Sequence, residues 1–178
     1  MKNPWKTIKK NIIFQNKFGY TFRDDDVITP SNQPGKYMVL EGYEYSIIVA
    51  LTSKNEVLMT KQWRYPINEE SFELPAGGLS LGETPLSAAQ RELLEETGAV
   101  ADNWKKLVSY WTANGVSKLK HHIFLAKNAK ILHPTYHDAT EKISVLLTPF
   151  KKLIQMINDG EINEERTLIG LLLAEKYI

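Results

Sequence analysis

The sequence lacks cysteine, a strong net charge and any long apolar run. None of its 178 residues is cysteine, so no disulfide can form, which is typical of proteins of the reducing cytosol. Lys and Arg number 22 and Asp and Glu 21, and the net charge of +1 favours neither nucleic acid nor a membrane as partner. The longest apolar runs, such as YSIIVAL at 45–51, are far too short to span a bilayer. From these absences we expect a cytoplasmic protein without nucleic-acid or membrane partners.

The N-terminus also lacks the apolar core of a secretion signal. Residues 1–15, MKNPWKTIKKNIIFQ, are basic but contain no such core, so we expect no signal peptide. The chain is 43% apolar, which is enough to build a folded core. Its length fits one domain with a small appended element.

Most of the chain carries strand patterns. β-Branched and aromatic residues predict strands at 7–15, 18–29, 37–42, 44–52 and 56–63, and SFELPAGG predicts a short strand that ends at Pro75. Three later segments, WKKLVSYWTA, KHHIFLAKNA and KISVLLTP, also read as strands. The chain ends in two predicted helices, at about 148–158 and 164–176. We therefore predict a mixed sheet with one central helix and a helical tail.

The central helix has the sharpest boundaries. In GGLSLGETPLSAAQRELLEETG at 77–98, Thr84 is expected to cap a helix that begins at Pro85. The helix is expected to end at Thr97, with Gly98 directly after it. One face of this helix is predicted to be an apolar stripe that packs on the sheet. Its members are Leu86, Ala89 and Leu93, with Leu94 at the edge.

Acidic side chains border that stripe. Glu92 and Glu96 are four residues apart and share one side of the helix, while Arg91 precedes Glu95 by four. Like charges at this spacing repel each other, and more strongly near a core, unless a bound divalent cation reverses the sign. Arg91 would neutralise Glu95 and fix its rotamer. RELLEE at 91–96 by itself also fits a solvated helix face with an ion pair, and this alternative stays open here.

The wider stretch resembles the Nudix box. Gly77, Glu83 and the run from Arg91 to Ala99 match the family pattern Gly-x5-Glu-x7-Arg-Glu-U-x-Glu-Glu-x-Gly-U, in which U is apolar. The resemblance implies an α/β/α sandwich with a mixed central sheet. It also implies hydrolysis of a nucleoside diphosphate linked to another group, with Mg²⁺ or Mn²⁺ as cofactor.

The same resemblance assigns roles within the box. Glu92 and Glu96 would be the main metal ligands, and Glu95 a further ligand or a base held by Arg91. Glu83 would support the loop or bind an outer metal through water. The glycines at the two ends of the box would allow its tight backbone.

The segment before the box resembles that of ADP-ribose pyrophosphatases and related nucleotide-sugar hydrolases. In KQWRYPINEESFELPAGG at 61–78, the resemblance makes Arg64 a substrate contact and the Ala76 carbonyl a metal ligand. Trp63 would stack on the base. Alternatively, Trp63 is a core or interface aromatic, and Arg64 pairs structurally with Glu73.

Both ends of the chain resemble the same subgroup. In the C-terminal part, Glu141 would be the catalytic base or position the water, with Asp138 in reserve; an ordinary exposed loop acid is the alternative. The N-terminal strands resemble a small antiparallel β-subdomain exchanged between two subunits. We therefore expect residues 1–42 to be that subdomain, 43–178 to be the Nudix domain, and the protein to be a homodimer. Tyr20, or Phe18, would stack on the base from the partner subunit.

One loop departs from the subgroup. In YWTANGVSKLKHH at 110–122, Asn114-Gly115 replaces a Pro-Gly pair, and Lys118 and Lys120 lie where an acid is common. This loop favours a substrate with more phosphate or a different sugar, or is simply solvated surface. The adjacent His121 and His122 would face opposite sides of a strand and are not expected to bind metal together.

The expected function is metal-dependent hydrolysis of the pyrophosphate bond of ADP-ribose or a related nucleoside-diphosphate sugar. The products would be a nucleoside monophosphate and a sugar phosphate. Two alternatives remain. One is hydrolysis of other compounds in which a nucleoside diphosphate is linked to another group, or of nucleoside triphosphates, modified or not. The other is a non-catalytic module that binds nucleotide sugars.

Overall fold

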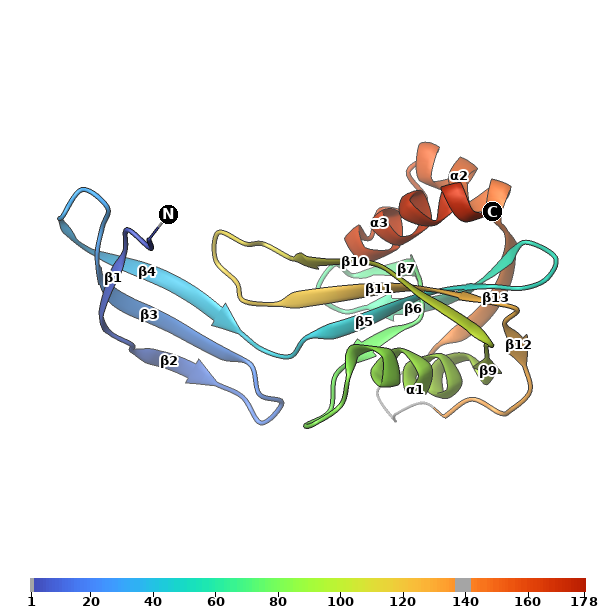
Figure 1. Cartoon of the computed structure of the whole chain (residues 1–178), viewed down its shortest axis with the longest axis horizontal. Helices are drawn as coiled ribbons and strands as arrows, with labels where there is room; N and C mark the ends of the chain where they lie inside the picture. Colours follow the sequence, from blue (N-terminus) through green and yellow to red (C-terminus); the bar gives the residue numbers. More distant parts are fainter. Residues whose placement is uncertain (1, 137–141) are drawn as a thin grey trace. The chain divides into compact units, whose positions relative to one another are not determined.

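The computed structural model describes residues 2–136 and 142–178, which form two units (Figure 1). Unit 1 comprises Met1–Glu44 with Tyr110–His121, and unit 2 comprises Tyr45–Ser109 with His122–Ile178. The strands are β1 (Lys6–Lys9), β2 (Ile12–Gln15), β3 (Thr21–Ile28), β4 (Pro34–Glu41), β5 (Tyr45–Leu51), β6 (Glu56–Arg64), β7 (Glu69–Glu73), β8 (Ala76–Gly78), β9 (Ala99–Val100), β10 (Asn103–Trp111), β11 (Lys120–Lys127), β12 (Lys130–Ile131) and β13 (Ser144–Pro149). The helices are α1 (Pro85–Thr97), α2 (Phe150–Asn158) and α3 (Glu165–Ala174), followed by a 3₁₀ turn, Glu175–Tyr177.

Unit 1 contains an antiparallel sheet in which β3 pairs with β1 and β2 along one edge and with β4 along the other. The single strand expected at 7–15 is broken into β1 and β2. At the break, the Asn11 carbonyl accepts the Asp24 N–H at 2.9 Å, and its side chain donates to the Asp24 carbonyl and the Asp26 carboxylate. The side-chain amide thus binds β3 between two register shifts, one at Thr7/Lys9 and one at Ile12/Phe14.

The alternating side chains of β3 bury charge as well as apolar surface. Arg23 and Asp25 are both almost fully buried, and they form a bidentate pair at 2.9–3.1 Å. Arg23 also contacts the Glu41 carboxylate on β4 at 2.6 Å. Each buried charge therefore has a partner of opposite sign, which compensates for its removal from water.

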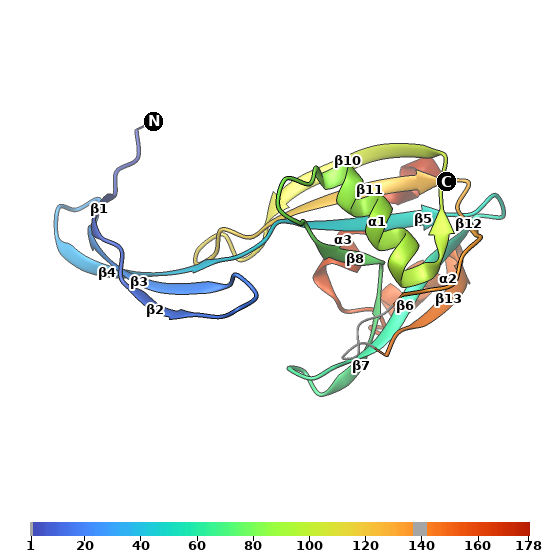
Figure 2. The same ribbon diagram turned by 90° about the horizontal axis from the view of Figure 1, so that it is seen from below.

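Unit 2 is built on a mixed sheet in the order β10-β11-β5-β6-β13, with β7 also paired to β6 and β8 to β5. Helix α1 lies on one face of this sheet, and α2 and α3 lie on the other, as two perpendicular views show (Figures 1 and 2). The central strand β5 is therefore covered on both sides, and its residues Ile47–Ala50 have no exposed surface. This burial explains why its sequence is a continuous apolar run rather than an alternating one.

The segment around Pro75 differs from the sequence prediction. Strand β7 ends at Glu73, and a second short strand, β8, begins at Ala76. Strand β7 pairs with β6, whereas β8 pairs with β5. The chain therefore passes from the side of β6 to the side of β5 just before the box. The short strands β9 and β12 pair with each other and were not predicted, because two residues carry no periodic pattern. Within the described ranges, no helix has both the length and the apolar character needed to cross a bilayer.

Candidate active site

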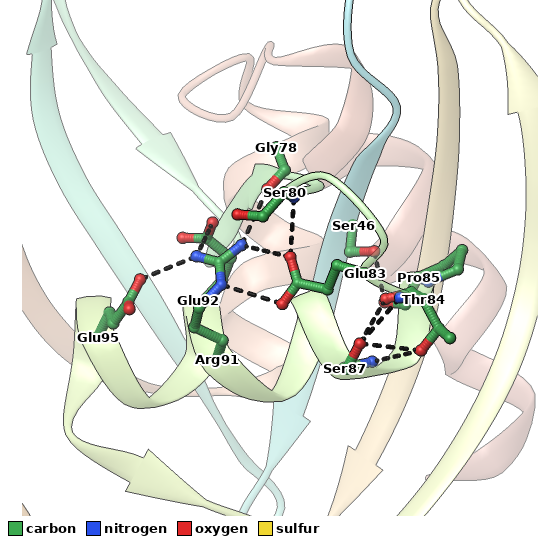
Figure 3. A network of polar contacts seen from close by, with 10 residues as sticks. All are labelled: Ser46, Gly78, Ser80, Glu83, Thr84, Pro85, Ser87, Arg91, Glu92 and Glu95. Atoms are coloured by element: carbon green, nitrogen blue, oxygen red, sulfur yellow. Dashed lines mark hydrogen bonds and ion pairs between the residues drawn. The ribbon is translucent and has the colours of Figure 1, made fainter.

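Helix α1 has the boundaries that the sequence predicted, and local hydrogen bonds fix its start (Figure 3). The Thr84 N–H donates to the Ser87 hydroxyl at 3.0 Å, and the Ser87 N–H donates to the Thr84 hydroxyl at 3.1 Å. The Pro85 carbonyl accepts a hydrogen bond from the Ser46 hydroxyl of β5 at 2.6 Å. At the other end, Gly98 adopts φ 68°, a left-handed conformation that closes the helix at little cost for glycine. The acidic residues between these caps are thereby held in a fixed register.

The buried side of α1 differs slightly from the predicted stripe. Ala89 and Leu93 are completely buried, as expected, and they pack with Ile48 and Leu58 of the sheet. Leu86 in the first turn is exposed, so it lies outside the contact with the sheet. Its place is taken by residues nearer the middle and the end of the helix. These are Ala88, Glu96 and Thr97.

Arg91 is the centre of the polar network on α1 (Figure 3). Its guanidinium donates to Glu92 at 2.6 Å, to Glu95 at 2.9 Å and to both oxygens of Glu83 at 3.0–3.1 Å. It also donates to the Gly78 carbonyl at 2.9 Å, which ties the helix to the loop before it. The Arg91–Glu95 pair was predicted from the spacing of four. The contacts to Glu83 and Gly78 were not, because the loop brings them together over eight and thirteen residues.

The network shifts the pKa values of Glu83 and Arg91. Hydrogen bonding by Arg91 lowers the pKa of Glu83 below its usual value, and the Ser80 N–H acts in the same direction. The same hydrogen bond to Glu83 raises the pKa of Arg91, and the bonds to Glu92 and Glu95 add to this shift. Glu83 and Arg91 therefore each favour the ionised form in the presence of the other.

The carboxylates of Glu92 and Glu96 lie against the main chain of β8, which precedes the loop to α1. The Ala76 N–H donates to the Glu96 carboxylate at 3.0 Å, and Glu96 is only 8% exposed. The Glu92 carboxylate lies over Gly77, where a Cβ would come within 1.9 Å of its Cδ. Two carboxylates of one helix thus converge on two adjacent residues, Ala76 and Gly77.

This donor set fits a hard divalent cation. Within the described ranges, no three carboxylate or imidazole groups converge closely enough to enclose an ion by themselves. Mg²⁺ does not require such a cage, since it usually keeps waters and substrate phosphates beside one or two carboxylates. Glu92 and Glu96, next to the main chain of Ala76, supply oxygen donors of that kind.

Arg64 and Trp63 lie at the end of β6. Arg64 forms a bidentate ion pair with Glu73 on β7, with its Nε 2.6 Å from Oε1. This is the structural pairing that the sequence left open as an alternative, and the side chain of Arg64 remains 40% exposed. Trp63 is 58% exposed in the chain and is not a residue of the core.

Some sequence-predicted residues lie elsewhere. Glu141 and Asp138 are outside the described residues. Tyr20 belongs to unit 1, where its ring lies edge-on to Tyr43 with centroids 6.3 Å apart. Phe18, also in unit 1, is 61% exposed.

The basic loop is engaged within unit 1. The Lys118 ammonium lies 3.1 Å from the Glu41 carboxylate, and the Lys120 ammonium lies over the Trp111 ring at 5.4 Å from its centroid. The neighbouring histidines have separate partners, as expected from their opposite faces. His121 contacts the Tyr110 hydroxyl at 3.3 Å, whereas His122 contacts the Ser109 hydroxyl at 2.7 Å.

Sequence reasoning predicted the helix α3 but missed the ion pairs of Arg166 at its start. Arg166 contacts Glu164 at 2.6 Å and reaches Glu73 at 3.4 Å. Both arginines, Arg64 and Arg166, line a cavity of about 590 Å³ in unit 2. The acid–acid–Arg–Thr order at 164–167 was the available signal, but its partner Glu73 lies 93 residues earlier in the sequence.

Comparison with known proteins identifies the family of this chain. The family model described as NUDIX domain matches residues 42–167. The chain is 30% identical to a methanol dehydrogenase activator of Bacillus methanolicus and 29% identical to an ADP-ribose pyrophosphatase of Bacillus subtilis. Each match covers 93% of this chain and 90% of the relative. A crystal structure described as an ADP compounds hydrolase superposes with a TM-score of 0.86 at 18% identity, covering 97% of this chain and 93% of the other. The predicted fold class is thereby confirmed, and the chain belongs to the Nudix family.

Proposed function

We propose that this protein hydrolyses the pyrophosphate bond of ADP-ribose or a related nucleoside-diphosphate sugar, with Mg²⁺ or Mn²⁺ as cofactor. The observation that carries the proposal is the convergence of Glu92 and Glu96 on Ala76 and Gly77 beside the Arg91 network. A cluster of carboxylates held in place beside the main chain suits a cation that in turn binds an anionic diphosphate.

In this proposal, Glu92, Glu96 and the Ala76 carbonyl hold the cation, with Glu95 as a further ligand or a base. When bound, the cation would neutralise the charge of the diphosphate and lower the pKa of the attacking water. Arg91 orients Glu92 and Glu95 through its bonds of 2.6 and 2.9 Å. Its hydrogen bonds to Glu83 and the Gly78 carbonyl fix the position of the guanidinium.

The remaining roles are assigned to flanking residues. Arg64 contacts the substrate, and Trp63 stacks on the base, for which its 58% exposure leaves room. Glu141 serves as base or positions the water, and Tyr20 of the partner subunit stacks on the base. We also propose a cytoplasmic homodimer in which residues 1–42 form the exchanged subdomain and 43–178 the Nudix domain.

The choice of a nucleotide sugar is supported by the names of similar proteins. A relative in Bacillus subtilis is an ADP-ribose pyrophosphatase, and the structural neighbour is described as acting on ADP compounds. The basic loop was the feature that weakened this choice. Since Lys118 is paired with Glu41 inside unit 1, its presence does not by itself require a more highly phosphorylated substrate.

A panel hydrolysis assay tests the proposal. ADP-ribose, GDP-mannose, ADP-glucose, NADH, diadenosine polyphosphates and nucleoside triphosphates are incubated with Mg²⁺ and then Mn²⁺, and the products are separated by chromatography. We expect AMP and ribose 5-phosphate from ADP-ribose, or the matching pair from another nucleotide sugar, at rates well above the rest. Release of pyrophosphate from triphosphates as the leading reaction would contradict the proposal. Tight ADP-ribose binding without turnover would instead support a binding module.

A further inference from the structure

A single buried carboxylate in unit 2 is shared by two arginines from different elements. The side chain of Glu73, at the end of β7, is 3% exposed. Arg64 of β6 donates to both of its oxygens, and Arg166 of α3 approaches the second oxygen at 3.4 Å. Glu73 therefore has a second positive partner already in place.

The two arginines differ in how firmly they are held. The Arg166 side chain is 19% exposed, and its Nε donates to the Glu164 carboxylate at 2.6 Å. Glu164 is itself fixed, because it caps α3 by accepting from the Thr167 N–H at 2.9 Å and the Thr167 hydroxyl at 2.8 Å. Burial lowers the pKa of Arg166, but the charges of Glu164 and Glu73 outweigh it, so the pKa is raised overall. Arg166 is thus a permanent cation in a rigid setting.

Arg64 is the more accessible partner. Its side chain is 40% exposed, and its hydrogen bonds to the protein go to Glu73. It lines the same cavity of about 590 Å³ as Arg166, together with Ile67 and Asn163. The negative charge of Glu96 also acts on the Arg64 guanidinium, which places Arg64 within the field of the carboxylates proposed to hold the cation.

A buried carboxylate that loses its only counter-charge is strongly destabilised. If Glu73 had Arg64 as its sole partner, any movement of Arg64 toward a substrate would leave that carboxylate uncompensated. With Arg166 anchored by Glu164, the carboxylate keeps an opposite charge when Arg64 moves. The Thr167 hydroxyl also accepts the Leu74 N–H at 2.9 Å, which ties α3 to the residue after Glu73.

We propose that Arg166 is a positioning residue for substrate binding: it retains Glu73, so that Arg64 can exchange this carboxylate for an anionic oxygen of the substrate's diphosphate. The inference rests on the proposed function, since it takes a diphosphate as the ligand of Arg64. It adds a residue of α3 to the binding apparatus, although that residue does not itself contact the substrate.

Steady-state kinetics on ADP-ribose test the coupling between the two arginines. We expect Arg166→Gln to raise KM about tenfold with little change in kcat, and Arg166→Lys, which keeps the charge, to stay within about threefold of the parent. Adding Arg166→Gln to Arg64→Gln should raise KM no further, because the effect of Arg166 passes through Arg64. The exposed neighbour Glu165 supplies the control, and Glu165→Gln should match the parent. Independent, multiplying effects of the two arginine substitutions, or an equal loss from Arg166→Lys, would overturn the inference.

Nuclear magnetic resonance gives a readout that does not need turnover. The ¹⁵N-labelled arginine Nε signals are assigned from the same variants and titrated with inorganic pyrophosphate and Mg²⁺. We expect the Arg64 signal to move and the Arg166 signal to stay, whereas movement of both or of neither contradicts the exchange. If Arg64 responds to pyrophosphate while no nucleotide sugar is hydrolysed, the proposed function fails and the exchange at Glu73 stands.

Discussion

The carboxylate of Glu92 occupies the space that a side chain at residue 77 would need. An ideal Cβ built on Gly77 would lie 1.9 Å from both Glu92 Cδ and Oε1. Gly77 is therefore required by the close approach of a functional group. At Gly98 a φ of 68° favours glycine, and a Cβ there would also lie 2.0 Å from the His133 carbonyl oxygen.

Gly77→Ala is expected to lower kcat by about 10- to 100-fold, because the added methyl group displaces the Glu92 carboxylate by an ångström or more. The fold should persist, since the displaced atoms are the end of a flexible side chain. Gly115→Ala is the matched control, because a Cβ there meets no atom within 4 Å. Kinetics together with thermal melting of both variants check this prediction, and unchanged turnover in Gly77→Ala would contradict it.

Glu96→Gln is expected to reduce hydrolysis by more than about 100-fold while the protein stays folded. Glutamine keeps the length of the side chain and an oxygen that can accept the Ala76 N–H, so only the charge is lost. Turnover and circular dichroism are measured beside Glu161→Gln, an exposed acid between α2 and α3. Full activity of Glu96→Gln would remove Glu96 from the metal ligands.

Glu83→Gln is expected to destabilise the protein in a pH-dependent way. Arg91 holds the pKa of Glu83 below its ordinary value of about 4.3, so ionised Glu83 stabilises the folded state above that pH. This contribution is lost as the pH falls through the lowered, folded-state pKa. Urea unfolding of both proteins at several pH values between 7 and 3 should therefore show a gap in unfolding free energy that narrows toward acid. A gap that is constant or widens toward acid would show that Arg91 does not stabilise the Glu83 carboxylate.

Trp63→Ala is expected to raise KM about tenfold at nearly constant kcat, because stacking on a base contributes to binding. Its indole is 58% exposed, so the melting temperature should change little. Trp111, which is 53% exposed on β10, offers a matched substitution with no expected effect on KM. If Trp63→Ala leaves KM unchanged in the substrate panel, base stacking by Trp63 is excluded.

The sequence alone was sufficient for the elements whose signals are local. Helix α1 begins at Pro85 and ends at Thr97 as predicted, because the Thr84 cap and Gly98 act within one turn of the chain. The acidic spacing on this helix also placed Glu95 beside Arg91 correctly. The Arg64–Glu73 pair, which the sequence left open as an alternative, is present. The long apolar strand β5 was equally clear, because burial on both faces leaves a continuous pattern.

Tertiary structure decided which charged groups, distant in the sequence, form ion pairs. No local pattern links Glu73 to Arg166, which meet only because α3 packs beside β7, and none predicts that Arg23 is buried between Asp25 and Glu41. The sequence also did not show that Glu92 lies against Gly77 or that Arg91 reaches the Gly78 carbonyl. Helix caps and periodicity are fixed by neighbours along the chain. The partner of a buried charge is fixed instead by sheet pairing and helix packing, which bring together residues many positions apart.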